Sequence, residues 1–177
     1  LRMSRLLAGD APAMYAYRSD PEVCRFQSFE PGSLADVEEF IRGLEANAFD
    51  TPGTWFQFAI RLRESGRLIG DLGTHFGADN PCQVEIGITV SPAHQGQGYG
   101  KEAVTGMLGH LLGPLEKHRV FASVDPRNRP SVSLLERVGM RKEAHFVQSL
   151  RFKGEWVDDV VYGILASEWK KGPGGSS

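Results

Sequence analysis

The chain has 177 residues, which is somewhat more than one average domain and well short of two. Apolar residues make up 41% and charged residues 24%, as is usual for a globular protein with one core. The 20 basic and 22 acidic side chains give a net charge of −2 and leave no broad basic surface for nucleic acid. No apolar run approaches the roughly 18 residues of a membrane-spanning helix. We therefore expect neither a nucleic-acid nor a membrane partner.

The spacing of the two cysteines indicates the cellular compartment of the protein. Cys24 and Cys82 lie far apart and form neither a CxxC pair nor a metal-ligand pattern. We expect two free thiols, no metal, and a reducing, cytoplasmic location. The sequence predicts a single domain over residues 1–170 without a signal segment. The Gly- and Ser-rich residues 171–177 are expected to be a disordered tail or a remnant of expression.

In the first 50 residues the pattern predicts an edge strand and two helices. Leu1–Leu6 alternates apolar and polar residues, which is typical of a strand. A first helix is expected to begin at Asp10 and to end before Pro21. Ser33 and Asp36 form a capping-box pattern at the start of a second helix. The apolar stripe of that helix is Val37, Phe40, Ile41 and Leu44.

After residue 53 the apolar period changes from about 3.6 to 2, which predicts an antiparallel meander. Its strands are expected at Trp55–Leu62, Arg67–Phe76 and Cys82–Val90. A helix, a strand, a helix and two strands are expected to follow, at Gly98–Leu112, Arg119–Val124, Pro130–Val138, Ala144–Phe152 and Trp156–Leu165. The sum is one α/β domain with about four helices and a single strand-helix-strand crossover.

The densest candidate site is the segment from Gln95 to Lys101, between an expected strand and an expected helix. Its glycines, Gly96, Gly98 and Gly100, let backbone N–H groups converge without an intervening Cβ. At a helix N-terminus such donors form a cradle for phosphate. A tight turn without a ligand is the alternative, although such a turn seldom needs so many glycines.

Two familiar phosphate loops fit this segment poorly. Gly98-x-Gly100-x-x-Ala103 matches a dinucleotide fingerprint, but that loop normally follows the first strand of a series of βαβ units, not a meander. A P-loop requires Ser or Thr after Gly-Lys, and Lys101 is followed by Glu102. The sequence therefore disfavours a Rossmann-type oxidoreductase and a P-loop enzyme.

Four further motifs occur in register with the glycine loop, and one of them, Glu85-Ile86-Gly87, precedes it. Gln95-x-x-Gly98-x-Gly100 follows Val90-Ser-Pro92, and Asn128-x-x-Ser131 opens the next expected helix. Gly154-Glu155-Trp156-x-Asp158 lies at the last hairpin, and Asp20-Pro21-Glu22-Val23 lies between the first two helices. Together they resemble the GNAT superfamily of acyl-CoA N-acyltransferases, in the branch that contains ribosomal-protein N-terminal acetyltransferases. The resemblance covers nearly the whole chain.

The resemblance implies a mixed, mostly antiparallel, seven-stranded sheet that splays between strands four and five, with acetyl-CoA as co-substrate in the gap. The pantetheine arm would bond to the strand-four backbone at Ile88, Thr89 and Val90. The pyrophosphate would be held by Gln95, Gly96, Gln97, Gly98, Tyr99, Gly100 and Lys101. Asn128 would bond the pantetheine arm, and it is equally suited to cap the helix that follows it.

Acylation of an amine needs a base, because an ammonium of pKa about 10 must lose a proton before it attacks. Direct attack within a ternary complex needs no covalent nucleophile. We expect Glu85 to be the base, since it faces away from the apolar side of its strand with Gly87 beside it. A solvated strand glutamate is the alternative reading. His75, on the neighbouring strand, is the second candidate and would act through a water.

The departing thiolate needs stabilisation or a proton. Many family members place a tyrosine on the helix after the Asn motif, where this chain has Leu134 and Leu135. The ribosomal-protein branch has a serine that Ser131 matches, and a bond to sulfur or to helix N–H groups is open to it. Gln148–Arg151 lacks the branch's acidic residue, which weakens the case for a ribosomal substrate.

We therefore expect an acetyl-CoA-dependent N-acetyltransferase of the GNAT fold with Glu85 and Ser131 as catalytic residues. The acceptor is a primary amine, either a protein N-terminus or a small molecule such as a polyamine, an amino acid or an aminoglycoside-like drug. The sequence leaves a homodimer open. The alternative is a non-catalytic module that binds or senses acyl-CoA.

Overall fold

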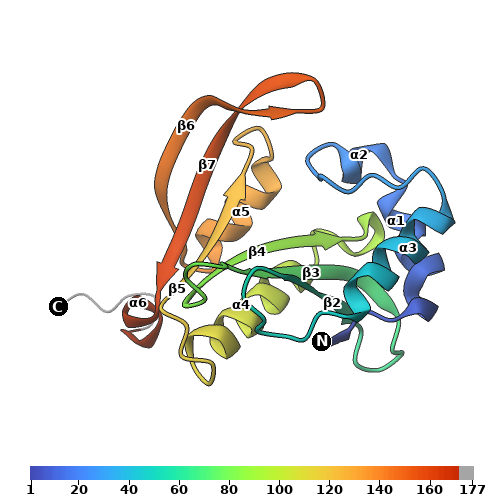
Figure 1. Cartoon of the computed structure of the whole chain (residues 1–177), viewed down its shortest axis with the longest axis horizontal. Helices are drawn as coiled ribbons and strands as arrows, with labels where there is room; N and C mark the ends of the chain where they lie inside the picture. Colours follow the sequence, from blue (N-terminus) through green and yellow to red (C-terminus); the bar gives the residue numbers. More distant parts are fainter. Residues whose placement is uncertain (172–177) are drawn as a thin grey trace.

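The period-2 segment forms the centre of the sheet in the computed structural model, which describes residues 1–171 (Figure 1). Its strands are β2 (Trp55–Arg61), β3 (Leu68–Phe76) and β4 (Gln83–Val90), and β3 pairs antiparallel with both β2 and β4. The whole sheet runs in the order β1-β2-β3-β4-β5-β7-β6. The remaining strands are β1 (Arg2–Arg5), β5 (Arg119–Val124), β6 (Arg141–Phe152) and β7 (Glu155–Leu165). The predicted mixed, mostly antiparallel, seven-stranded α/β fold is confirmed.

The predicted helices begin where the sequence supplies a cap. The Oγ of Ser33 accepts a hydrogen bond from the N–H of Asp36 at 3.3 Å, and the Asp36 carboxylate accepts one from the N–H of Ser33 at 2.9 Å. This reciprocal capping box starts α3 (Leu34–Glu45). The other predicted helices are α1 (Ala11–Arg18), α4 (Tyr99–Leu112) and α5 (Arg129–Arg137).

Within residues 1–171 the structure has six α-helices rather than about four. The sequence predicts Asp20-Pro21 only as the end of α1, but the Asp20 carboxylate also accepts from the N–H of Glu22 at 2.9 Å and starts α2 (Pro21–Cys24). The second missed helix is α6 (Ala166–Lys171), which directly continues β7. Of the expected tail, residues 172–177 lie outside the described residues.

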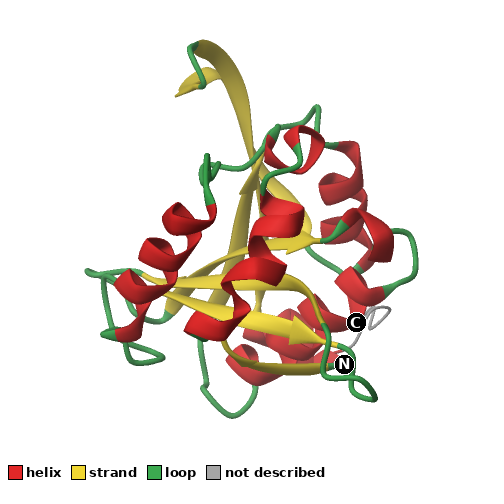
Figure 2. Ribbon diagram, turned by 90° about the vertical axis from the view of Figure 1, so that its right-hand side faces the viewer, coloured by secondary structure: helices red, strands yellow, loops and turns green. Residues whose placement is uncertain are grey.

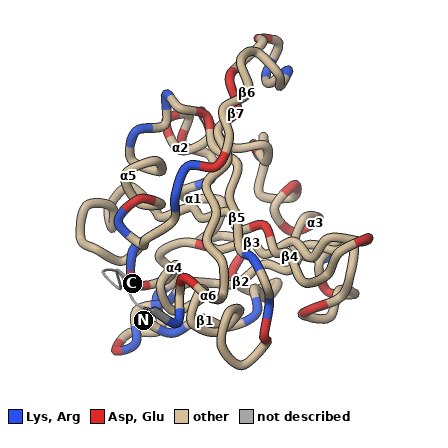
Figure 3. Tube along the Cα trace, turned by 90° about the vertical axis from the view of Figure 1, so that its left-hand side faces the viewer, with Lys and Arg blue, Asp and Glu red and all other residues tan. Residues whose placement is uncertain are grey.

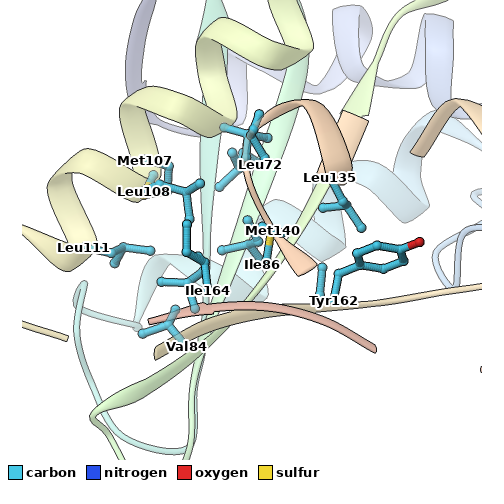
Figure 4. Close-up of a cluster of buried hydrophobic side chains, with 14 of the residues drawn as sticks. Leu72, Val84, Ile86, Met107, Leu108, Leu111, Leu135, Met140, Tyr162 and Ile164 are labelled. Carbon is cyan, nitrogen blue, oxygen red and sulfur yellow. The ribbon is translucent and has the colours of Figure 1, made fainter. Parts of the chain in front are cut away.

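Helices cover both faces of the sheet (Figures 1 and 2). On one face, Met107, Leu108 and Leu111 of α4 pack in one cluster with Val84 and Ile86 of β4, and Leu135 of α5 joins them (Figure 4). On the other face, α1 and α3 pack through a second cluster that includes Met14, Val37, Ile41 and Ala59. Odd-numbered residues of β4 therefore face α1 and α3, and even-numbered ones face α4 and α5.

The sheet opens between β4 and β5. These neighbours are parallel, and their pairing runs only from Gln83 opposite Arg119 to Glu85 opposite Phe121. Beyond that point β4 continues to Val90 and β5 to Val124 without pairing with each other, and the two strands diverge (Figure 1). The predicted splay between the fourth and fifth strands is therefore confirmed, and it begins directly after Glu85.

The β6–β7 hairpin projects beyond the rest of the sheet, on the far side of the opening from α2 (Figure 1). Lys and Arg residues are interspersed with Asp and Glu residues in the view of Figure 3. No helix within residues 1–171 is long and apolar enough to cross a bilayer.

Candidate active site

A cavity of about 820 Å³ occupies the opening between β4 and β5. Its walls come from both strands, from α5, from the loop between α2 and α3, and from the tip of the β6–β7 hairpin. Polar groups in its lining include Glu85, Ser123, Asp125, Asn128, Ser131, Asp158 and Asp159. Aromatic side chains in the lining are Phe26, Phe29, Phe40, Trp55 and Phe152. A small molecule or a peptide end fits a cavity of this size and mixed lining.

Two glycines form the floor of the cavity. Gly73 of β3 lies opposite Gly87 of β4 in the ladder, and both line the cavity. A Cβ on Gly87 would meet no atom within 4 Å, so this position keeps space open. A Cβ on Gly73 would lie 2.8 Å from the Oε1 of Gln57 and 3.1 Å from the Trp55 ring, so Gly73 permits a close approach of neighbouring side chains.

Glu85 stands at the edge of this floor, where the sheet begins to open. Its cross-strand neighbour is His75, whose ring stacks on Trp55 with centroids 5.0 Å apart. Glu85 is half-buried, and no hydrogen-bond or ion-pair partner for it occurs among residues 1–171. Burial raises the pKa of Glu85, with an opposing contribution from His75 and a raising one from the charge of Asp159. The two predicted base candidates therefore lie side by side.

The glycine loop connects the end of β4 to α4. Gly96 and Gly98 have positive φ angles of 72° and 84°, which non-glycine residues rarely adopt. The Gln95 side-chain amide donates to the Val90 carbonyl at 2.9 Å, and the Gln97 amide donates to the Ala93 carbonyl at the same distance. These glutamines brace the loop with their side chains. The backbone N–H of Gln95 donates to the Pro92 carbonyl at 3.2 Å, whereas that of Gln97 remains available to a ligand.

The loop has unpaired donors at the start of α4. The N–H groups of Gly96, Gln97 and Gly98 have no acceptor among the described residues. Those of Tyr99, Gly100 and Lys101 lie in the first turn of α4, where a helix offers no internal acceptor. A run of exposed N–H groups at a positive helix end fits a phosphate group. The residues present are therefore suited to the pyrophosphate of acetyl-CoA.

Asn128 and Ser131 line the cavity opposite β4. The Oδ1 of Asn128 accepts a hydrogen bond from the N–H of Ser131 at 3.3 Å. Asn128 therefore caps α5, which is one of the two roles that the sequence analysis gives it. The Ser131 hydroxyl has no hydrogen-bond partner within residues 1–171. The Ser131 hydroxyl therefore does not cap α5. Leu134 and Leu135 also line the cavity, where many family members have a tyrosine.

A buried ionic network borders the cavity. Asp71 of β3 is fully buried and accepts from the Tyr17 hydroxyl at 2.5 Å and from the Arg18 guanidinium at 2.5 and 3.2 Å. Gln57 donates to the same carboxylate. Burial raises the pKa of Tyr17, as does the charge of Asp71. The network ties α1 to β2 and β3 and holds Arg18 and Gln57 as fixed walls of the cavity.

The sequence reasoning missed the contribution of β5 and β7 to the site. Ser123 of β5 and Asp159 of β7 line the cavity, and the Ser123 hydroxyl donates to the Oδ1 of Asp159 at 2.6 Å. The two adjacent aspartates at 158 and 159 point to opposite faces of β7 and both line the cavity, so this acidic pair was the signal that the β7 sequence carried. Its use required the register of β7 against β5, which the sequence does not reveal.

Comparison with known proteins agrees with this geometry. Residues 1–141 match the family model described as an acetyltransferase (GNAT) domain. The chain belongs to the GNAT acetyltransferase family. It is 29% identical over 162 residues to an uncharacterised N-acetyltransferase, YnaD, of Bacillus subtilis, with 90% of each chain covered. It is 27% identical over 129 residues to the ribosomal protein uS5-alanine N-acetyltransferase of Escherichia coli, with 71% of this chain and 66% of that protein covered.

Solved structures show the same GNAT fold. An acetyltransferase from Bacillus anthracis superposes with a TM-score of 0.82 at 25% identity, covering 94% of this chain and 95% of that chain. The spermidine N-acetyltransferase of Vibrio cholerae, solved with CoA and spermine, superposes with a TM-score of 0.80 at 21% identity, covering 96% and 97%. The predicted resemblance is confirmed, and the GNAT chain is an acetyl-CoA-dependent N-acetyltransferase.

Proposed function

We propose that this GNAT enzyme transfers the acetyl group to a primary amine by direct attack within a ternary complex, with Glu85 as base and Ser131 as partner of the sulfur. The observation that carries the proposal is the position of the splay, because β4 and β5 separate directly after Glu85 and Phe121. Glu85 and Ser131 then line one cavity from opposite sides of the gap. Acetyl-CoA supplies the thioester whose acetyl group the amine takes.

The cofactor side of the proposal rests on the N–H groups of the glycine loop. The segment from Gln95 to Lys101 would hold the pyrophosphate, with the backbone N–H groups of Gly96 to Lys101 as the donors. The edge of β4 at Ile88, Thr89 and Val90 would hold the pantetheine arm. The absence of a β5 partner along this part of β4 supports that assignment, since the backbone groups that point away from β3 lack a strand partner there. Asn128 caps α5 through Oδ1 and would have its side-chain N–H groups left for the pantetheine arm.

Glu85 fits the role of base through its setting. The carboxylate is half-buried and lacks a cationic partner within residues 1–171, and burial raises its pKa toward that of an amine. A base of raised pKa accepts the proton of an ammonium more readily than a solvated carboxylate does. His75 remains close enough to take part, since it is the cross-strand neighbour of Glu85.

Ser131 fits the role of sulfur partner because its hydroxyl is free. It lies in the first turn of α5, where the N–H groups add positive potential, and Asn128 already supplies the cap. A hydroxyl there would stabilise negative charge that develops on the departing thiolate. The second proton lost by the nitrogen would end on that sulfur.

An amine panel tests the function. Release of free thiol from acetyl-CoA is measured with small primary amines, polyamines, aminoglycosides and peptides with free N-termini. Thiol release with at least one amine, and mass-spectrometric detection of the acetylated product, is the expected result. Binding of acetyl-CoA without thiol release in the presence of any amine would favour the non-catalytic alternative.

Two further expectations are part of the proposal. A cytoplasmic location is supported by Cys24 and Cys82, which are both free thiols. A homodimer is supported by exposed apolar side chains on the projecting hairpin, namely Phe146, Val147 and Trp156. Light scattering coupled to gel filtration gives the mass in solution, and a monomer at micromolar concentration would contradict the dimer.

A further inference from the structure

A second carboxylate faces the gap from the side opposite Glu85. Asp159 of β7 lines the same cavity. Glu85 lies opposite Phe121 of β5, and Ser123, two residues further, lies opposite Val161 of β7. Residues paired in a ladder, and residues two apart in a strand, share one face of a sheet. Glu85 and Asp159 therefore lie on the same face, one on each side of the splay.

The ion-pair pattern distinguishes these carboxylates from the others in the cavity. Asp125 and Asp158 also line it, but each has a basic partner. The pairs are Asp125 with Arg127 at 2.7 Å and Asp158 with His145 at 2.7 Å. Among residues 1–171, neither Glu85 nor Asp159 has a cationic partner within ion-pair distance. The Ser123 hydroxyl holds Oδ1 of Asp159 at 2.6 Å, so this carboxylate is oriented but not neutralised.

A buried hydroxyl on the same face also points to a bound molecule. Thr89 lines the cavity, is 5% exposed, and its Oγ1 has no hydrogen-bond partner among the described residues. Buried polar groups normally have a partner, so an unpaired one marks a place where a ligand or an ordered water supplies it. Gly87 leaves the floor open between Glu85 and Thr89. The cavity wall that runs from Glu85 and Asp159 to Thr89 is therefore suited to a polar ligand.

We propose that Asp159 is an acceptor-binding residue that, together with Glu85, holds the acceptor as its ammonium ion and makes the enzyme selective for cationic amines. The inference rests on the proposed function, because it concerns the acceptor half of the same site. An ammonium has three N–H donors, and carboxylates on two sides of it accept charge-assisted hydrogen bonds. The cation also offsets the repulsion between the two carboxylates, which are otherwise unpaired.

The proton balance follows from this arrangement. The bound ammonium gives one proton to the Glu85 carboxylate, directly or through a water, and becomes a neutral amine. Its nitrogen forms the C–N bond to the acetyl carbon while the C–S bond breaks. The nitrogen then loses a second proton, which ends on the departing sulfur. Asp159 takes no proton in these steps and holds the nitrogen in place.

Asp159→Asn tests the inference, because the amide keeps the size of the side chain and an oxygen for Ser123 but removes the charge. The probe is the best amine of the panel, at a pH where it is protonated. We expect the KM for that amine to rise at least tenfold, with the Kd for acetyl-CoA changed less than twofold by calorimetry. Asp79→Asn, in the exposed turn before β4, removes the same charge far from the cavity and is expected to change neither constant.

A pH profile separates binding of the ammonium from a merely structural role. His75 from β3 and Asp159 from β7 are the charged groups that act on Glu85, and the Asp159 charge raises the Glu85 pKa. In Asp159→Asn the acidic limb of kcat/KM therefore moves to lower pH. An unchanged acidic limb and an unchanged KM in a variant that still binds acetyl-CoA would overturn the inference and leave the proposed function intact.

The remaining outcomes are also decisive. If the wild-type enzyme releases no thiol with any amine, the proposed function fails and the inference fails with it. If Asp159→Asn does not fold, Asp159→Ser carries the same test, since its hydroxyl is small and still bonds with Ser123. A rise in KM with either variant together with a shift of the acidic limb supports the assignment.

Discussion

Gly73 and Gly87 lie directly opposite each other in the β3–β4 ladder, at the point where the cavity meets the sheet. The absence of a side chain at Gly87 leaves backbone as the floor of the cavity there, whereas Gln57 and Trp55 lie close over Gly73. Glu85 lies two residues before Gly87, so the open space is placed beside the proposed base. Filling this space tests whether it belongs to the acceptor.

Gly87→Val is expected to lower kcat/KM for the amine at least tenfold while the Kd for acetyl-CoA changes less than threefold. The valine side chain would project into the space above the floor, where an added Cβ meets no protein atom. Valine is also well suited to a strand, so the melting temperature should not fall. Steady-state kinetics and calorimetry check both parts, and normal amine kinetics would place the acceptor elsewhere.

Gly98→Ala is expected to weaken acetyl-CoA binding at least tenfold, because Gly98 has φ 84° and its N–H belongs to the proposed cradle. Gly66→Ala is the matched control, since Gly66 has φ 68° in the β2–β3 turn and equally open surroundings. Both variants should lose about 1–2 kcal/mol of stability through left-handed strain. Equal acetyl-CoA affinities in the two variants would argue against the cradle.

Ser131→Ala is expected to lower kcat without changing the melting temperature or the acetyl-CoA affinity, because its hydroxyl bonds to no described residue. Asn128→Ala removes the cap of α5 and should cost about 1 kcal/mol of stability. The two variants thus separate a catalytic role from a helix-capping role, which the sequence leaves open for both residues. A normal kcat for Ser131→Ala would remove the serine from the mechanism.

Much of this fold was predictable because its signals are local. Ser33 and Asp36 form the predicted capping box, and the β5 bounds, Arg119–Val124, agree with the apolar alternation. Short helices were harder, because Asp20-Pro21 serves both as the end of α1 and as the start of α2. A sequence pattern alone does not distinguish these two uses.

The candidate site was predictable on its β4 side and at the start of α5, where Asn128 and Ser131 line the cavity. The apolar–polar alternation around Glu85 and the spacing of the glycines in the loop are both local sequence patterns. Asp159 enters the site through the register of β7 against β5, a contact between strands that α5 and β6 separate along the chain. The roles of Asn128 and Ser131 stayed open in the sequence because both residue types suit a helix start, and only the observed hydrogen bond assigns the cap to Asn128.

The central claim is that Glu85 is the base. A base acts only when it is deprotonated, and burial raises the pKa of Glu85, so kcat/KM of the wild type should rise with pH along a limb displaced upward from the range of a free glutamate. The His75 charge opposes this displacement, and the Asp159 charge adds to it.

The most direct measurement is the pH profile of Glu85→Gln beside the wild type, with one amine and saturating acetyl-CoA. The amide keeps the size of the side chain and removes its basicity. We expect kcat to fall about 10²–10⁴-fold, as is typical for loss of a positioned base, and the acidic limb of the profile to disappear, while acetyl-CoA still binds. A variant that keeps more than about a third of the wild-type kcat, with the same acidic limb, would contradict the claim and leave His75 as the candidate base.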